Sequence, residues 1–203
     1  MASYYPVSHK LAVGLSLIAL FLSASTVSLP CKAGEVTADA IITALKGRKT
    51  RSLIKPRAEA VAAFADLREI RKTRGLTMHE REELYEASKV LPQIDLRILF
   101  NFDSDEVQPN GMNALNEVAK ALKSEDLRGK SFVIAGHTDR KGTPDYNIDL
   151  SLRRAEAVKL ILVADGVDAD TIATVGFGFE QLANKNDPYA AENRRVQFVK
   201  WND

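Results

Sequence analysis

The second half of the chain alternates short apolar runs with longer stretches whose apolar residues recur at helical spacing. Residues 94–102 begin with alternating apolar and polar positions, as a half-buried strand does. The expected elements are a strand at 94–102, a helix from Pro109, a strand at 131–136, a helix at 144–164, and strands at 171–179 and 196–201. This β-α-β-α-β-β order predicts an α+β fold, a mixed sheet with helices packed on one face, in which the last two strands can pair directly.

The helix expected at 144–164 begins at Thr143-Pro144, where Thr143 caps and Pro144 takes the first helical position. Its apolar stripe, expected to face the core, consists of Ile148, Leu152, Ala155, Val158 and Leu162. Asn147, Leu150 and Arg154 are spaced i, i+3, i+7, so they share a different face. The helix therefore combines a core stripe with a second face that carries a guanidinium.

Asp139 lies in the glycine-containing loop GHTDRKGTPDYN, directly after the strand expected at 131–136. Folds of the α/β type bind ligands at this end of a strand. If Asp139 and Arg154 face one gap, they suit a zwitterion, because the carboxylate binds an ammonium and the guanidinium binds a carboxylate. Spacing alone leaves another interpretation open: an Asp139–Arg154 ion pair without a ligand, or two unrelated solvated charges.

For residues 34–91 the sequence predicts a small helical region of unknown role. Apolar spacing and breakers indicate helices at 36–46, 57–74 and 77–90, the last with a capping box between Thr77 and Glu80. Five cations between residues 48 and 57 would suit an anionic partner, although such a charge run is more typical of a solvated linker.

The chain of 203 residues has 28 basic and 27 acidic side chains and a formal charge of +1. Apart from the five cations at 48–57, no polybasic run stands out, which argues against nucleic acid as a partner. The uninterrupted apolar run at 11–22, followed by small residues, predicts a signal peptide at residues 1–33. Two alternatives stay open: an uncleaved membrane anchor at 11–29, and a lipoprotein acylated at Cys31, against which Pro30 argues.

Several spaced motifs within residues 92–203 resemble the OmpA-like, peptidoglycan-associated C-terminal domain family. They are ILFNFDSDEV, GHTDRKGTPDYNIDLSLRRAEAV, VGFGFE and ENRRVQF, in the family's order and spacing. The resemblance implies a periplasmic module, associated with the outer membrane and the cell wall, that binds peptidoglycan noncovalently. It implies binding through the diaminopimelate of the stem peptide, whose free end carries an amine and a carboxylate. Outer-membrane or other envelope proteins are further partners that it implies.

The resemblance also assigns roles residue by residue. The family's ligand-binding aspartate and arginine correspond to Asp139 and Arg154, and its pocket asparagine corresponds to Asn147. Further pocket positions that it implies are Thr138, Asp103 and, at the rim and with a mainly structural role, Arg194.

The sequence predicts no catalytic residue, no metal site and no cofactor. His137 and Asp139 lack a third partner at metal-ligand spacing, and His137 is expected to be a packed loop histidine. No serine or cysteine has the surroundings of an activated nucleophile. A third class of protein stays open, a flagellar-stator-like wall anchor held by an uncleaved N-terminal membrane helix. Such a helix usually has an ionisable residue in or beside it, and residues 11–29 contain none.

Overall fold

The computed structural model describes residues 36–47, 60, 62–64 and 76–201. The expected signal peptide at 1–33, the basic run and most of the helix expected at 57–74 lie outside these residues. Within the described part of the chain, no helix is both long enough and apolar enough to span a bilayer.

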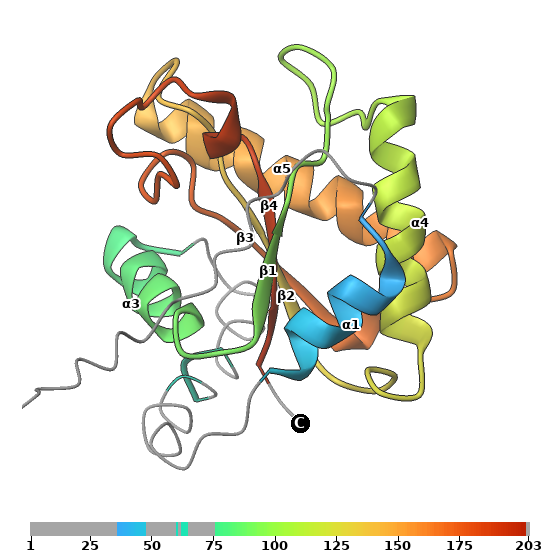
Figure 1. Ribbon diagram of the computed structural model, residues 1–203. Coiled ribbons are helices and arrows are strands. Elements are labelled where there is room, and N and C mark those ends of the chain that lie inside the picture. Colours follow the sequence, from blue (N-terminus) through green and yellow to red (C-terminus); the bar gives the residue numbers. More distant parts are fainter. Residues whose placement is uncertain (1–35, 48–59, 61, 65–75, 202–203) are drawn as a thin grey trace, which may run out of the picture. The chain divides into compact units, whose positions relative to one another are not determined.

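Four strands form one mixed sheet in the order β1-β4-β2-β3 (Figure 1). Their bounds are β1 Gln93–Leu96, β2 Phe132–Gly136, β3 Ile172–Gly176 and β4 Val196–Lys200. β2 and β3 are parallel, and β4 runs antiparallel to both β1 and β2. The predicted α+β architecture and its β-α-β-α-β-β order are therefore confirmed.

The pairing expected for the last two strands is wrong. β4 does not pair with β3 but lies between β1 and β2, with Phe198 opposite both Ile94 and Ile134. All five residues of β4 are buried, including Gln197 and Lys200. A strand covered on both faces suits the centre of the sheet rather than an edge.

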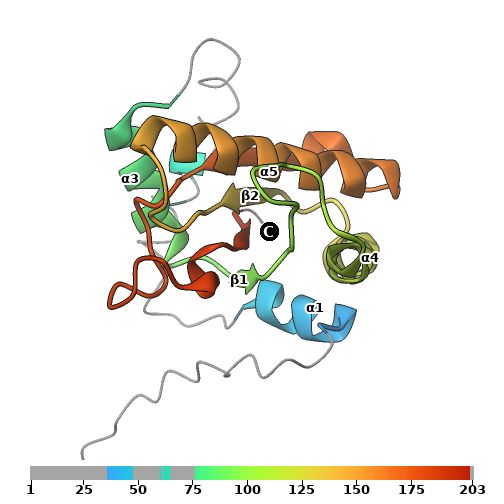
Figure 2. The ribbon, with the colours of Figure 1, turned by 90° about the horizontal axis from the view of Figure 1, so that it is seen from above.

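Three helices cover one face of the sheet: α1 (Ala38–Lys46), α4 (Pro109–Lys123) and α5 (Pro144–Ala164). Figure 2 shows them around one side of the strands. Their apolar stripes meet the sheet in one core, where α1 contributes the fully buried Ile41 and Leu45. Burial of this apolar area is the main source of stability.

The opposite face of the sheet is covered by residues that precede the sheet in the sequence. These are α3 (Met78–Ser88), Ala60 and Phe64. α3 begins with the predicted capping box, in which Thr77 and Glu80 bond each other's backbone amides. Arg81 of α3 donates two hydrogen bonds to Glu180, at 2.9 and 2.7 Å. The helices expected on one face are found there, and α3 adds cover that the sequence did not predict.

Two glycines let α5 approach the carboxyl ends of β2 and β3. A Cβ atom on Gly136 would lie 2.0 Å from the carbonyl oxygen of Ser151, and one on Gly176 would lie 2.6 Å from that of Ile148. Side chains at these positions would collide with the helix backbone. This close approach holds the start of α5 beside the loops that follow both strands.

The close approach also changes which face of α5 is buried. Ala155, Val158 and Leu162 are buried as expected, but Ile148 and Leu152 are only half-buried. The residues buried in the first half of the helix are instead Asn147, Leu150, Ser151 and Arg154. The expectation that the face of Arg154 lies apart from the buried face is therefore wrong, because this part of the helix rests on the glycine ends of the strands.

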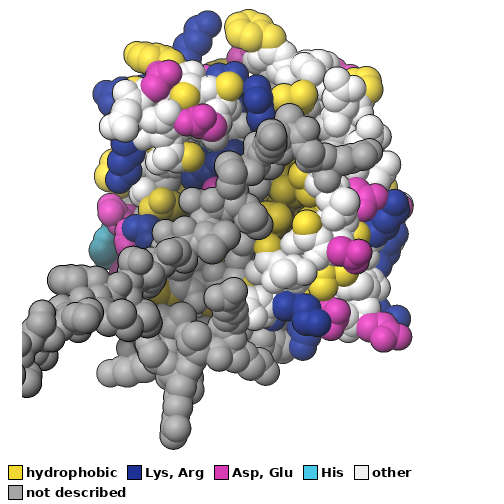
Figure 3. All heavy atoms as spheres, in the orientation of Figure 1, with side chains coloured by type: hydrophobic (Ala, Val, Ile, Leu, Met, Phe, Trp, Pro, Cys, Tyr) yellow, Lys and Arg dark blue, Asp and Glu magenta, His cyan; other side chains and the backbone are white. Residues whose placement is uncertain are grey.

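The described residues on one face of the molecule carry charges of both signs. Basic and acidic side chains are interspersed over the face seen in Figure 3. Nucleic-acid binding depends on neutralising many phosphates with clustered cations. Among the described residues on this face, the cations therefore form no continuous basic track for nucleic acid.

Candidate functional site

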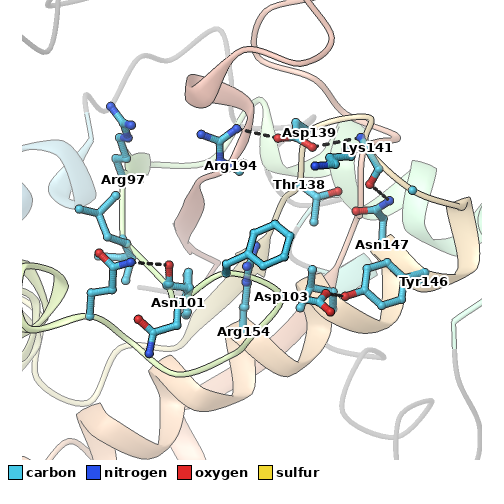
Figure 4. A pocket seen from close by; sticks show the side chains of 17 residues that line it. Arg97, Asn101, Asp103, Thr138, Asp139, Lys141, Tyr146, Asn147, Arg154 and Arg194 are labelled. Atoms are coloured by element: carbon cyan, nitrogen blue, oxygen red, sulfur yellow. Dashed lines mark hydrogen bonds and ion pairs between the residues drawn. The ribbon is translucent and has the colours of Figure 1, made fainter.

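A pocket of about 640 Å³ opens where the loop after β2, the start of α5 and the segment after β1 meet (Figure 4). All six residues assigned to the ligand from the sequence line it: Asp103, Thr138, Asp139, Asn147, Arg154 and Arg194. They come from separate parts of the chain. The fold thus brings together the residues that the sequence analysis selected.

Asp139 lies three residues after Gly136, the last residue of β2, and is held by two contacts. One carboxylate oxygen accepts a hydrogen bond from the backbone N–H of Lys141 at 3.0 Å. The other pairs with a guanidinium nitrogen of Arg194 at 2.6 Å. The side chain of Asp139 is 15% exposed and that of Arg194 is 44% exposed, so the pair lies at the pocket edge, with Arg194 on its solvent side.

Arg154 enters the pocket from α5 with only 9% of its surface exposed. Its Nε donates to the backbone carbonyl of Ser104 at 2.9 Å, and its guanidinium lies 4.8 Å from the centre of the Phe100 ring. Among the described residues, no carboxylate forms an ion pair with it. The simple Asp139–Arg154 ion pair is therefore not formed, since Asp139 pairs with Arg194 instead.

The electrostatics of Arg154 favour an anionic ligand. Burial lowers the pKa of Arg154, and the nearby cations Arg153 and Arg194 lower it further. Asp139 acts in the opposite direction, so the two charges interact without touching. A guanidinium that is poorly solvated and lacks a carboxylate partner is stabilised when a ligand brings one.

Asn147 organises the loop that carries Asp139. Its side-chain N–H group donates to the backbone carbonyls of Lys141 and Thr143, at 2.9 and 3.0 Å. Thr143 caps α5 as predicted, accepting from the backbone N–H of Tyr146. Asn147, 2% exposed, thus positions the loop and leaves its amide oxygen as the group it can offer to a ligand.

Thr138 and Asp103 complete the pocket wall. The backbone N–H of Thr138 donates to the carbonyl of Gly178 at 2.8 Å, but its buried hydroxyl has no hydrogen-bond partner in the part of the chain that the structure describes. Asp103 adopts a positive φ of 55° and accepts a hydrogen bond from the hydroxyl of Tyr146. Buried hydroxyls are normally paired, so the unpaired Thr138 hydroxyl is an exception in the wall of this pocket.

The pocket also contains residues that the sequence analysis did not select, chiefly Phe100, Phe102, Lys141 and Tyr146. All four lie inside the motifs already singled out, ILFNFDSDEV and GHTDRKGTPDYN. Their positions within these motifs were the only sequence signal that they belong to the site. The contact between the two motifs depends on the tertiary structure.

His137 and Arg195 flank the pocket residues without lining it. His137 is 2% exposed and stacks on Phe177 with ring centres 5.3 Å apart, as expected for a packed loop histidine. Burial lowers the pKa of His137 well below its usual value, and the charge of Arg195 adds to this effect. Arg195 bonds Asp95 and the carbonyl of Gln181, both at 3.2 Å. Within the described residues, no group of three His, Cys, Asp or Glu side chains is placed to hold a metal ion.

Residues 99–195 match the model of the OmpA family. The chain is 41% identical over 103 residues to the peptidoglycan-associated lipoprotein of Pseudomonas aeruginosa, covering 50% of this chain and 60% of that protein. It is 39% identical over 113 residues to outer membrane protein A of Bordetella avium, covering 55% of this chain and 56% of that protein. The chain thus spans less than two thirds of either relative.

One solved structure similar to the chain is that of the peptidoglycan-associated lipoprotein from Burkholderia pseudomallei. The two are 35% identical, with 50% of this chain and 86% of that chain covered and a TM-score of 0.44.

Proposed function

The C-terminal half of the chain is an OmpA-like domain, and we propose that this domain binds peptidoglycan noncovalently through the diaminopimelate of the stem peptide. The domain acts as a binding module and not as an enzyme. For the rest of the chain we propose an export signal at residues 1–33 and a helical region of unknown role at residues 34–91. The bound wall would make the protein an anchor that maintains the cell envelope.

The observation that carries the proposal is the pair of opposite charges that line one pocket, Asp139 and Arg154. The free end of diaminopimelate presents an ammonium and a carboxylate on one carbon. The ammonium can take the place of Arg194 at the Asp139 carboxylate, while the carboxylate meets the Arg154 guanidinium. Lysine has the ammonium but lacks the carboxylate, so this pocket should prefer diaminopimelate to lysine.

Two further groups support the same ligand. The unpartnered Thr138 hydroxyl can donate to the ligand carboxylate or accept from its ammonium. The Asn147 amide keeps the loop of Asp139 in place before the ligand arrives. A site held in its binding geometry loses less conformational entropy on binding.

We place the protein in the periplasm, associated with the cell wall and the outer membrane. The names of the two relatives, a peptidoglycan-associated lipoprotein and an outer membrane protein, support this location. Other envelope proteins would be its further partners. The stator-like alternative, with an uncleaved membrane helix, depends on residues 11–29, which lie outside the described residues.

The direct test measures binding of the full chain to purified sacculi and to free diaminopimelate by co-sedimentation and calorimetry. We expect binding to diaminopimelate-type walls and weak binding to lysine-type walls. Asp139→Asn keeps the shape but removes the charge, and it should weaken binding by about ten- to a hundredfold.

The matched control is Asp170→Asn, because exposed Asp170 precedes β3 and therefore lies at the opposite end of the sheet from the pocket. Its binding should equal that of the wild type. Equal binding of both wall types, or wild-type affinity in Asp139→Asn, would refute the proposed function.

A further inference from the structure

Lys141 is held at the pocket by both of its backbone groups. Its N–H donates to the carboxylate of Asp139 at 3.0 Å, and its carbonyl accepts from the side chain of Asn147 at 2.9 Å. In Figure 4, Lys141 follows Asp139 along the side of the pocket, across from Arg154. The backbone of Lys141 is therefore fixed by the residues of the site, and its side chain extends from a defined point at the pocket mouth.

The side chain of Lys141 is a cation without a carboxylate partner among the described residues. Its ammonium lies 5.6 Å from the centre of the Phe102 ring, within the range of a cation–π contact. Both side chains line the same pocket as Asp139 and Arg154. The pocket mouth thus has a positive charge next to an aromatic ring.

Phe102 lies in a turn and is 89% exposed, the highest exposure among the large hydrophobic side chains that the structure describes. The turn is closed by the bond from the N–H of Asn101 to the carbonyl of Glu106 at 2.9 Å, and by a second bond between their side chains at 2.8 Å. An isolated bridge between Phe100 and Val107 closes its base. These contacts fix a ring in solvent at the rim of the site, where a ligand can cover it.

We propose that Lys141 and Phe102 form a second subsite for the residue of the stem peptide that precedes diaminopimelate. This inference rests on the proposed function. In the stem peptide that residue is a γ-linked glutamate, whose α-carboxylate is free unless it is amidated. Lys141 binds this carboxylate, and the Phe102 ring packs against the methylene groups of the same residue.

Geometry and charge both favour this occupant. The free end of diaminopimelate is separated from the α-carboxylate of the γ-linked glutamate by the diaminopimelate side chain, an amide and two methylene groups. When that free end is inserted in the pocket, the glutamate carboxylate therefore has to lie outside it, at the pocket mouth. The sugar rings of the glycan are further along the stem peptide. An ammonium on a flexible stem suits a carboxylate that is not fixed in a bidentate geometry, whereas the buried Arg154 suits one that is.

The test compares two synthetic stem peptides that are identical except that the α-carboxylate of the glutamate is free in one and amidated in the other. Calorimetry is done with the full chain as wild type, Lys141→Gln, Phe102→Ala and the control Lys130→Gln. Lys130 is a half-buried lysine two residues before β2 that does not line the pocket. Wild type and control should prefer the free carboxylate by about two- to fivefold, the range of an exposed ion pair.

Lys141→Gln should bind both peptides equally, and it should lose more affinity for the peptide with the free carboxylate than for free diaminopimelate. Phe102→Ala should weaken both peptides alike, by more than it weakens free diaminopimelate. Equal binding of the two peptides by the wild type, a preference that survives in Lys141→Gln, or unchanged peptide affinity in Phe102→Ala would overturn the subsite. If the wild type binds free diaminopimelate but does not discriminate between the peptides, only the subsite fails and the proposed function stands. If the wild type does not bind free diaminopimelate, both the proposed function and the subsite are overturned.

Discussion

Replacing Arg154 by methionine separates a ligand-binding arginine from a structural one. Methionine has a similar length and fills most of the same space, so the change removes the charge and the donors while opening little volume. Arg154 is 9% exposed and, among the described residues, forms no ion pair. Its direct polar contact is the bond from its Nε to the carbonyl of Ser104.

The expected change in stability is small because two terms oppose each other. The variant loses the bond to Ser104, worth about 1.5–3 kcal/mol for a charged donor, and the contact with the Phe100 ring, worth about 1 kcal/mol. It regains the cost of burying a guanidinium without a carboxylate, which is several kcal/mol. This desolvation is the main cause that lowers the pKa of Arg154. We therefore expect a melting temperature within about 4 °C of the wild type.

The expected change in binding is large because nothing replaces the bond to the ligand carboxylate. A charge-assisted hydrogen bond of about 1.5–3 kcal/mol corresponds to about ten- to a hundredfold in affinity. Sacculus co-sedimentation and thermal melting by circular dichroism should be measured on the same preparations. The two readouts together distinguish lost recognition from lost folding.

Arg153→Met is the matched control. Arg153 is the next residue on α5 but bonds Asp149 at 2.9 Å and does not line the pocket. It should bind sacculi as the wild type does. Wild-type affinity in a folded Arg154→Met protein would refute the binding role, and a melting temperature lowered by more than about 10 °C would refute the claim that this arginine contributes little to stability.

Two further predictions concern Gly136 at the end of β2 and His137, which follows it. Gly136→Ala should destabilise the fold by more than about 3 kcal/mol, seen in urea unfolding, because its Cβ would meet the Ser151 carbonyl at 2.0 Å; a cost below 1 kcal/mol would contradict this packing. Burial lowers the pKa of His137, so below about pH 6.5 the unfolded chain binds a proton that the folded chain does not. The free energy of unfolding should therefore fall as the pH decreases, by up to about 1.4 kcal/mol per pH unit. Urea titrations between pH 5 and 8 should show a shallower slope in His137→Gln, and an unchanged slope would contradict the assignment.

Much of the fold was predictable because the signals for its elements are local. Pro109 and Thr143-Pro144 mark the starts of α4 and α5, and the capping box at Thr77 marks the start of α3. The six candidate site residues were predicted from motifs in the sequence, and all of them line one pocket. Their role in binding diaminopimelate stays a proposal.

Other features were not predictable because they depend on contacts between distant segments. Nothing local distinguishes a last strand that pairs with β3 from one that lies between β1 and β2, since both need the same apolar run at 196–200. The periodicity of α5 predicted the wrong buried face in its first half, because the approach permitted by Gly136 and Gly176 outweighs apolar spacing there.

The sequence by itself determined the elements, their order and the residues that carry charge into the pocket. Only the tertiary structure decided that Asp139 pairs with Arg194, 55 residues away, and that Arg154 bonds Ser104, 50 residues away. Helix and strand periodicity reflects neighbours within one or two turns, whereas an ion pair reflects which loops the sheet order brings together. Lys141 and Phe102 meet at the pocket mouth for the same reason. The carboxyl ends of β1 and β2 lie at the same end of the sheet, so the turn after β1 and the loop after β2 are neighbours there.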